Sequence, residues 1–120
     1  MTWYLRTRYE DRRRSEIRER HYLDNGEVWF VVTTDGVAER SMACRFDRTK
    51  VAAARAAVGA AGLDTLDDIA ATGQDLAVMT YEWQLEGSTG RWVDAAYPAE
   101  VPDIIERLEE ALQTLEQDAG

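Results

Sequence analysis

The sequence predicts an α+β fold: a largely antiparallel sheet of about six strands, in the order ββββα(α)ββα, with helices packed on one face. Two observations predict this class. Six segments have the features of strands, either apolar residues that alternate with polar ones or, in residues 27–34, a short continuous run of β-prone apolar residues. In two other segments the apolar residues form a single stripe at helical spacing, and such a helix must pack its stripe against a sheet.

The first four predicted strands form two hairpins. The four segments are residues 3–9, 17–23, 27–34 and 37–46. Asn25-Gly26 lies between the second and third segments, and Asp35-Gly36 lies between the third and fourth. Both are predicted to be tight turns, because Asn and Gly tolerate a positive φ. Residues 27–34 are apolar on both faces, so we expect a central strand that is covered on both sides at its middle.

Alternation also predicts which side chains share a face of the sheet. In the first strand one face carries Trp3, Leu5, Thr7 and Tyr9. The opposite face, without helices, is predicted to carry Tyr4, Arg6, Arg8 and Tyr22. We expect this second face to be either solvated or the contact surface of a dimer.

The pattern then changes to helical spacing. Asp47 is a suitable N-cap, and the stripe of the helix that follows ends at Gly59 and Gly62. Its members are Val51, Ala54, Val58 and Ala61. Residues 63–69 are predicted to form a short second helix that Gly73 ends.

A third hairpin and a last helix complete the predicted fold. The hairpin comprises residues 76–85 and 91–97, with Trp83 on the inner face, and Pro102 fits the first position of the helix. The stripe of that helix is Ile104, Ile105, Leu108, Leu112 and Leu115.

The domain organisation is predicted to be one α+β domain over residues 1–120. Within it we distinguish an arginine-rich hairpin (1–24) and two hairpin–helix units (27–62 and 75–117). A shift of 51 residues aligns apolar positions of the two units, which suggests an internal repeat.

Charge is divided unequally along the chain. Residues 1–60 hold 12 basic and 9 acidic residues, whereas residues 61–120 hold 2 basic and 14 acidic ones. Such an acidic surplus is typical of a protein with a basic partner, or of adaptation to high salt. No apolar run is long enough for a membrane span or a signal peptide, so we expect a cytoplasmic protein without membrane contact.

Residues suited to catalysis or metal binding are few. His21 is the only histidine and Cys44 the only cysteine, so no internal disulfide is available, and Cys44 is interpreted as a small buried apolar residue. Four aspartates lack the spacing of a calcium loop and are interpreted as helix-capping residues: Asp64, Asp67, Asp68 and Asp75. We therefore expect no catalytic residue, no cofactor and no metal.

Seven arginines precede residue 21, a density that is compatible with nucleic-acid binding. However, four carboxylates lie among them: Glu10, Asp11, Glu16 and Glu19. Cross-strand ion pairs on a solvated face explain this mixture better. Direct binding of nucleic acid is therefore not expected.

The last helix carries the candidate binding residues. Its acidic residues surround the apolar stripe, and Glu106 and Glu110 are four positions apart, which is unfavourable for the helix itself. The predicted partner-binding residues are Glu100, Asp103, Glu106, Glu109 and Glu110. An acidic solvated face without a partner is the alternative.

Together these features favour a small acidic, non-enzymatic protein that binds and blocks a basic macromolecular partner, of the inhibitor, toxin-immunity or phage anti-defence type. A second hypothesis is a small-molecule-binding or enzymatic domain. It requires a pocket that holds a perturbed carboxylate, such as Glu82 beside Trp83 or Trp92. The third hypothesis is a structural homo-oligomer, such as a homodimer, joined through the exposed sheet.

Overall fold

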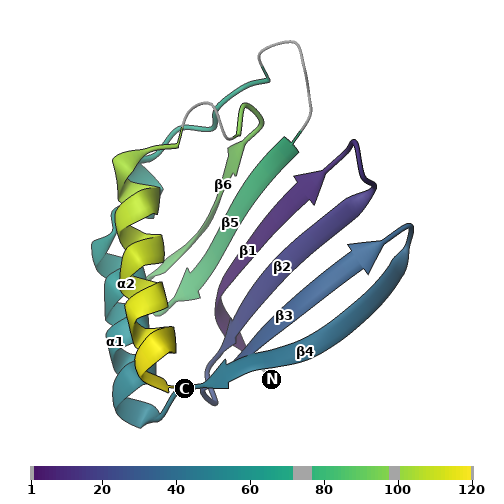
Figure 1. Ribbon diagram of the computed structural model, residues 1–120. Helices are drawn as coiled ribbons and strands as arrows, with labels where there is room; N and C mark the ends of the chain where they lie inside the picture. Colours follow the sequence, from purple (N-terminus) through teal and green to yellow (C-terminus); the bar gives the residue numbers. More distant parts are fainter. Residues whose placement is uncertain (1, 72–76, 98–100, 120) are drawn as a thin grey trace.

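The alternating segments pair into one antiparallel sheet, and both helices lie on one of its faces (Figure 1). This computed structural model describes residues 2–71, 77–97 and 101–119. The strands are β1 (Trp3–Asp11), β2 (Glu16–Leu23), β3 (Glu27–Thr34), β4 (Val37–Arg45), β5 (Ala77–Leu85) and β6 (Ser88–Asp94). The helices are α1 (Arg48–Ala60) and α2 (Asp103–Ala119), with a 3₁₀ turn, η1, at Leu63–Thr65. The predicted α+β class is confirmed.

The sheet order is β4-β3-β2-β1-β5-β6, so β1 joins the two halves of the chain by pairing with both β2 and β5. The expectation that residues 27–34 form a central strand is wrong. β3 lies beside the edge strand β4, and its Trp29 and Phe30 are only half-buried. Both units, β3-β4-α1 and β5-β6-α2, have the predicted hairpin-then-helix order, and duplication stays a prediction.

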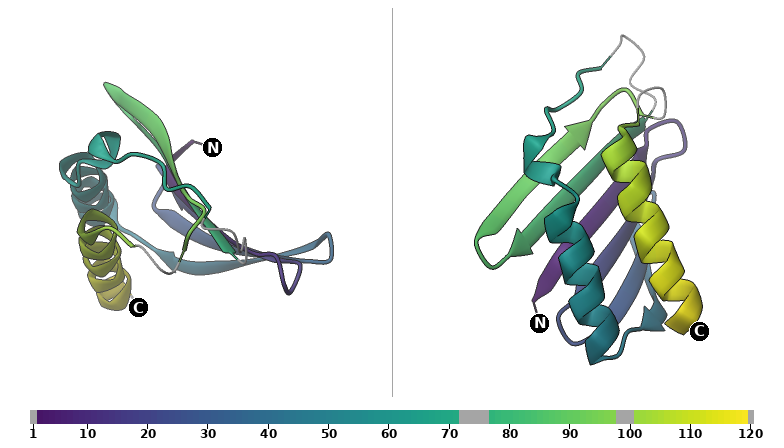
Figure 2. Two further views of the ribbon diagram at one scale, coloured as in Figure 1. Left: turned by 90° about the horizontal axis from the view of Figure 1, so that it is seen from above. Right: turned by 90° about the vertical axis from the view of Figure 1, so that its left-hand side faces the viewer.

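Helix α1 has the predicted N-cap, and helix α2 has the predicted apolar side. Asp47 caps α1, because its side chain accepts a hydrogen bond from the Lys50 backbone N–H at 2.8 Å. The buried stripe of α2 consists of Ile105, Leu108 and Leu112. Figure 2 shows the two helices side by side on the same face of the sheet, while the β3–β4 hairpin projects away from them.

The assignment of faces is partly wrong, because β1 contains an irregularity between Trp3 and Leu5. A bulge changes which side of the sheet successive residues face. Tyr4 and Leu5 are therefore both buried among the core residues, at 0% exposure. Tyr22, also predicted to be on the exposed face, is 3% exposed and belongs to the same core.

The segment after α1 differs from the predicted second helix. Only Leu63–Thr65 is helical, and the chain then runs along β6. The Ile69 N–H donates to the Val93 carbonyl at 2.9 Å, and the Ala95 N–H donates to the Ile69 carbonyl at 2.8 Å. These bonds cover part of the free edge of β6. The predicted end at Gly73 lies outside the described residues.

The third hairpin has a shorter turn than predicted, and its second strand is shifted: β6 spans Ser88–Asp94 instead of residues 91–97. Its turn needs only Glu86-Gly87, with Gly87 at φ 82°, and Leu85 pairs directly with Ser88. β6 therefore begins at Ser88 rather than at Arg91. Within the described ranges, no helix has the length and apolar character needed to cross a membrane.

Candidate functional site

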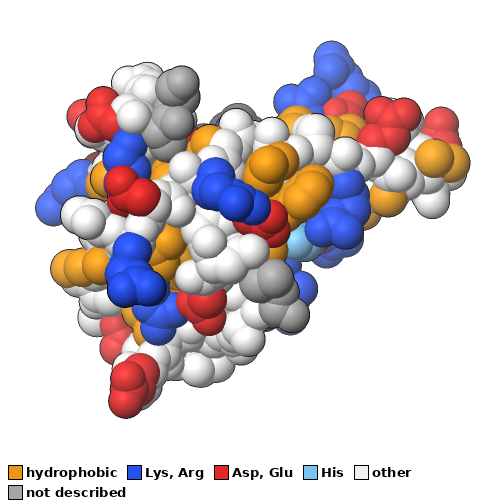
Figure 3. Space-filling view, turned by 90° about the horizontal axis from the view of Figure 1, so that it is seen from below, with side chains coloured by type: hydrophobic (Ala, Val, Ile, Leu, Met, Phe, Trp, Pro, Cys, Tyr) orange, Lys and Arg blue, Asp and Glu red, His pale blue; other side chains and the backbone are white. Residues whose placement is uncertain are grey.

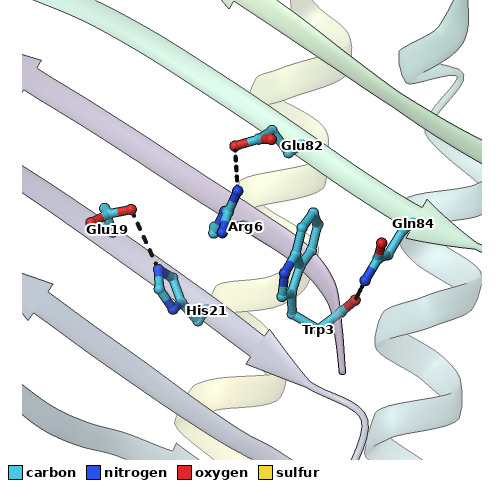
Figure 4. Close-up of polar contacts among 6 residues, drawn as sticks. All are labelled: Trp3, Arg6, Glu19, His21, Glu82 and Gln84. Atoms are coloured by element: carbon cyan, nitrogen blue, oxygen red, sulfur yellow. Dashed lines mark hydrogen bonds and ion pairs between the residues drawn. The ribbon is translucent and has the colours of Figure 1, made fainter. Parts of the chain in front are cut away.

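The face of the sheet without helices carries a polar cluster around Arg6 and Trp3 (Figure 4). The Arg6 guanidinium binds Glu82 across the strands at 3.0 Å and lies 4.5 Å from the centre of the Trp3 ring. The Gln84 side-chain amide donates to the Trp3 carbonyl at 2.9 Å. Trp29 on β3 likewise stacks with Arg40, at 4.8 Å. This face carries cross-strand pairs and arginine–tryptophan stacks, and a solvated face and a homodimer through it both stay predictions.

His21 belongs to this face, whereas Cys44 belongs to the other. His21 Nε2 lies 3.4 Å from Glu19 Oε1 (Figure 4). Cys44 pairs with Val28 and packs against the core, and burial raises the pKa of its thiol. The sheet therefore separates the two side chains, and they do not form a nucleophile–base pair.

We expect His21→Ala and Cys44→Ser each to leave partner binding unchanged, because the two side chains lie on opposite faces of the sheet and do not form a nucleophile–base pair. Circular dichroism checks that both variants are folded, and calorimetric titration measures the affinity for the partner. Loss of binding by either folded variant would contradict the expectation that His21 and Cys44 are dispensable for function.

Most arginines of the N-terminal hairpin are neutralised by nearby carboxylates. The pairs are Arg6–Glu82, Arg8–Glu10, Arg12–Glu10, Arg13–Asp11, Arg14–Asp11, Arg18–Glu16 and Arg20–Glu116. Figure 3 shows basic, acidic and apolar side chains interspersed on the projecting part of the sheet. This mixture favours the ion-pair interpretation over a phosphate-binding stripe.

The acidic residues of α2 lie on two different sides of the helix. Asp103, Glu106 and Glu110 are exposed, and in the described part of the chain they make no ion pair; we call these three the acidic face. Glu109 is half-buried and faces the sheet instead. Glu100 lies outside the described residues.

Glu109 and Glu116 fasten α2 to the sheet. Glu109 accepts a hydrogen bond from the Tyr81 hydroxyl. Glu116 binds Arg20 and accepts from the Tyr22 hydroxyl at 3.4 Å. Two residues seven positions apart lie on the same side of a helix, so this spacing is the one sequence signal for the shared role.

A groove of about 590 Å³ lies beside α2, where the helix leaves part of the sheet uncovered. Its lining includes Tyr9 from β1, Phe30 from β3, Tyr97 after β6 and Glu109 from α2. Arg18 and Arg20 of β2 also line it. The groove thus combines aromatic rings with charges of both signs, an arrangement suited to binding a charged ligand.

The small-molecule hypothesis required Glu82 beside Trp83 or Trp92. Trp83 and Trp92 are in the core, at 4% and 1% exposure, whereas Glu82 is on the face without helices, paired with Arg6. The groove therefore does not use that carboxylate.

Asp67 and Asp68 lie after η1 and do not cap a helix, and Asp64 lies in the first turn of η1 rather than at its N-cap. Asp68 accepts a hydrogen bond from the Val93 N–H at 2.9 Å, and the Asp67 carbonyl accepts from the Trp92 indole at 2.9 Å. The N-cap position of η1 is Gly62, which makes no side-chain cap bond. The described residues contain no cluster of three or more His, Cys, Asp or Glu side chains able to hold a metal, and Asp75 is not among them.

No protein-family model matches this chain, and no curated protein matches it. We therefore infer function from the contacts themselves.

Proposed function

We propose that this chain is a non-enzymatic binding protein that blocks a basic macromolecular partner, of the inhibitor, toxin-immunity or phage anti-defence type. The observation that carries the proposal is the acidic face of α2. Its three carboxylates are exposed and have no ion-pair partner among the residues that the structure describes. They remain free to meet charges on another molecule.

The contrast with the sheet supports this interpretation. There several carboxylates are matched by arginines, for example Glu27 by Arg45 at 2.9 Å and Glu82 by Arg6. On α2, Glu106 and Glu110 repel each other at i,i+4 spacing, so their arrangement does not serve the helix. A basic surface would relieve this repulsion and would be attracted from a distance, which raises the association rate.

Reversal of two charges tests the proposal. We expect Glu106→Lys/Glu110→Lys to weaken binding at least about tenfold, mainly through a slower association rate, because electrostatic steering acts on the encounter. Glu109 is left unchanged, because it holds Tyr81. The partner is first captured from the source cells and identified, and surface plasmon resonance then gives both rate constants across a salt series.

The control for this experiment is Glu39→Lys/Glu86→Lys, which changes the net charge equally at two exposed residues away from α2. We expect the control to change the affinity less than about threefold. If the affinity changes neither with the salt concentration nor with the charge reversal on α2, the acidic face is not the binding site. If the acidity is instead an adaptation to high salt, the protein has no partner and its melting temperature rises with salt as self-repulsion is screened.

A further inference from the structure

The groove beside α2 contains a pair of tyrosine rings that carry no cation. Tyr9 and Tyr97 meet edge to face, with ring centroids 5.3 Å apart and planes at 72°. Four other aromatic rings of the described chain each have an arginine over them: Phe30 with Arg20 in this groove, and Trp3 with Arg6, Trp29 with Arg40 and Tyr4 with Arg55 outside it. Among the described contacts, neither Tyr9 nor Tyr97 has one.

Glu109 places an uncompensated negative charge beside these rings. Its described partner is the neutral Tyr81 hydroxyl, and no ion pair involves it in the described ranges. The carboxylate and both rings line the same groove, and after burial the charge of Glu109 is the largest contribution that raises the pKa of Tyr97. A carboxylate beside aromatic faces is the chemistry that recognises organic cations.

The other charged groups of the groove already have partners. Arg18 binds Glu16 and Arg20 binds Glu116, whereas the Glu19 side chain contacts His21 on the opposite face of the sheet. An anion would have to compete with Glu16 and Glu116 for the two arginines while approaching Glu109. A cation meets the one charge that is still unmatched, so charge complementarity favours a cation.

We propose that this groove binds an arginine side chain of the basic partner, with the guanidinium against Tyr9 and Tyr97 and donating to the free oxygen of Glu109. Arginine fits better than lysine, because its planar guanidinium stacks on aromatic rings and is more weakly hydrated. The groove, about 590 Å³, has room for the whole side chain. This inference rests on the proposed function and names its binding site.

A pair of isosteric peptides tests the site without the partner. The probes are acetyl-Gly-Arg-Gly-amide and the same peptide with citrulline, which has nearly the same shape but no charge. Two-dimensional NMR of the ¹⁵N-labelled full chain follows each titration. We expect the arginine peptide to shift the amides of Tyr9, Tyr97 and Glu109, and to bind at least about tenfold more tightly than the citrulline peptide. Equal affinity of the two peptides would overturn the inference, as would shifts confined to residues outside the groove.

Two matched substitutions locate the charge. Glu109→Gln removes the charge but keeps an oxygen that can accept from Tyr81, so we expect a folded protein that loses most of the binding. Glu86→Gln removes the same charge from an exposed residue outside α2 and should bind the peptide as the wild type does. Equal losses in both variants would indicate general attraction and contradict the site. If Glu109→Gln is not folded, Tyr97→Leu tests the aromatic part, and unchanged binding by that variant contradicts the inference.

The inference and the proposed function can fail separately. If the partner loses affinity with Glu106→Lys/Glu110→Lys but not with Glu109→Gln, the acidic face is the binding surface and the groove is not. If the chain binds the arginine peptide in the groove but no basic partner responds to the charge reversal, the groove is a cation site and the proposed function is wrong.

Discussion

Replacing Leu108 or Leu112 with alanine is expected to lower the free energy of unfolding by about 2–5 kcal/mol in each case. Both side chains are almost fully buried, at 3% and 2% exposure, within the core between α2 and the sheet. Truncation removes apolar contacts and leaves a cavity that the surroundings fill only in part. Trp83 on the inner face of β5 is 4% exposed, so Trp83→Ala should have a similar effect.

Urea denaturation followed by tryptophan fluorescence and circular dichroism measures these changes. Glu110→Ala is the matched control on the same helix, and because Glu110 is exposed we expect a change within about 0.5 kcal/mol. Losses below about 1 kcal/mol for Leu108, Leu112 and Trp83 alike would contradict the packing of α2 on the sheet.

The helices and hairpins could be predicted because their signals are local. The stripe of Ile105, Leu108 and Leu112 and the capping by Asp47 depend on residues within two or three turns of each other. The turn at Asp35-Gly36 likewise depends on its own φ values, 51° and 84°. Such signals are present in the sequence whatever the rest of the chain does.

The wrong predictions concern features that depend on residues far away in the sequence, such as the order of the strands. Residues 27–34 were expected at the centre of the sheet, but β5 pairs with β1 and makes β1 central instead. No local pattern states which strands become neighbours. The bulge between Trp3 and Leu5 moves Tyr4 into the core, although strict alternation placed it outside.

The candidate site shows the same limit. Charge alone grouped Glu109 with Glu106 and Glu110, and only the packing of α2 separates it from them. The groove combines residues from β1, β3 and α2 with Tyr97, so its composition depends on the tertiary fold. A sequence can indicate an acidic surplus, but not which carboxylate will line a groove together with aromatic rings.

The second large effect concerns alkaline pH. Burial and then the charge of a nearby carboxylate raise the pKa of Tyr22, near Glu116, and of Tyr81, near Glu109, well above the ordinary value of 10.0. Burial and then Asp24 raise the pKa of Tyr4 in the same way. Above pH 10 the unfolded chain releases these phenolic protons while the folded chain keeps them. A raised pKa in the folded state therefore stabilises the protein below pH 10, and this stability is lost as the pH increases.

Each of these tyrosines should lower the free energy of unfolding by about 1 to 1.5 kcal/mol per pH unit above pH 10. The three together should cause cooperative unfolding within a few pH units of that value, since domains of this size are stable by only about 5–15 kcal/mol. Urea denaturation at fixed pH values from 8 to 11 measures the slope, and absorbance at 295 nm counts the phenolates that form before unfolding. Tyr22→Phe should reduce the loss of unfolding free energy per pH unit by about one third, because phenylalanine does not ionise. The burial of these hydroxyls would be disproved if all five tyrosines of the folded protein titrated near pH 10 while the free energy of unfolding stayed constant.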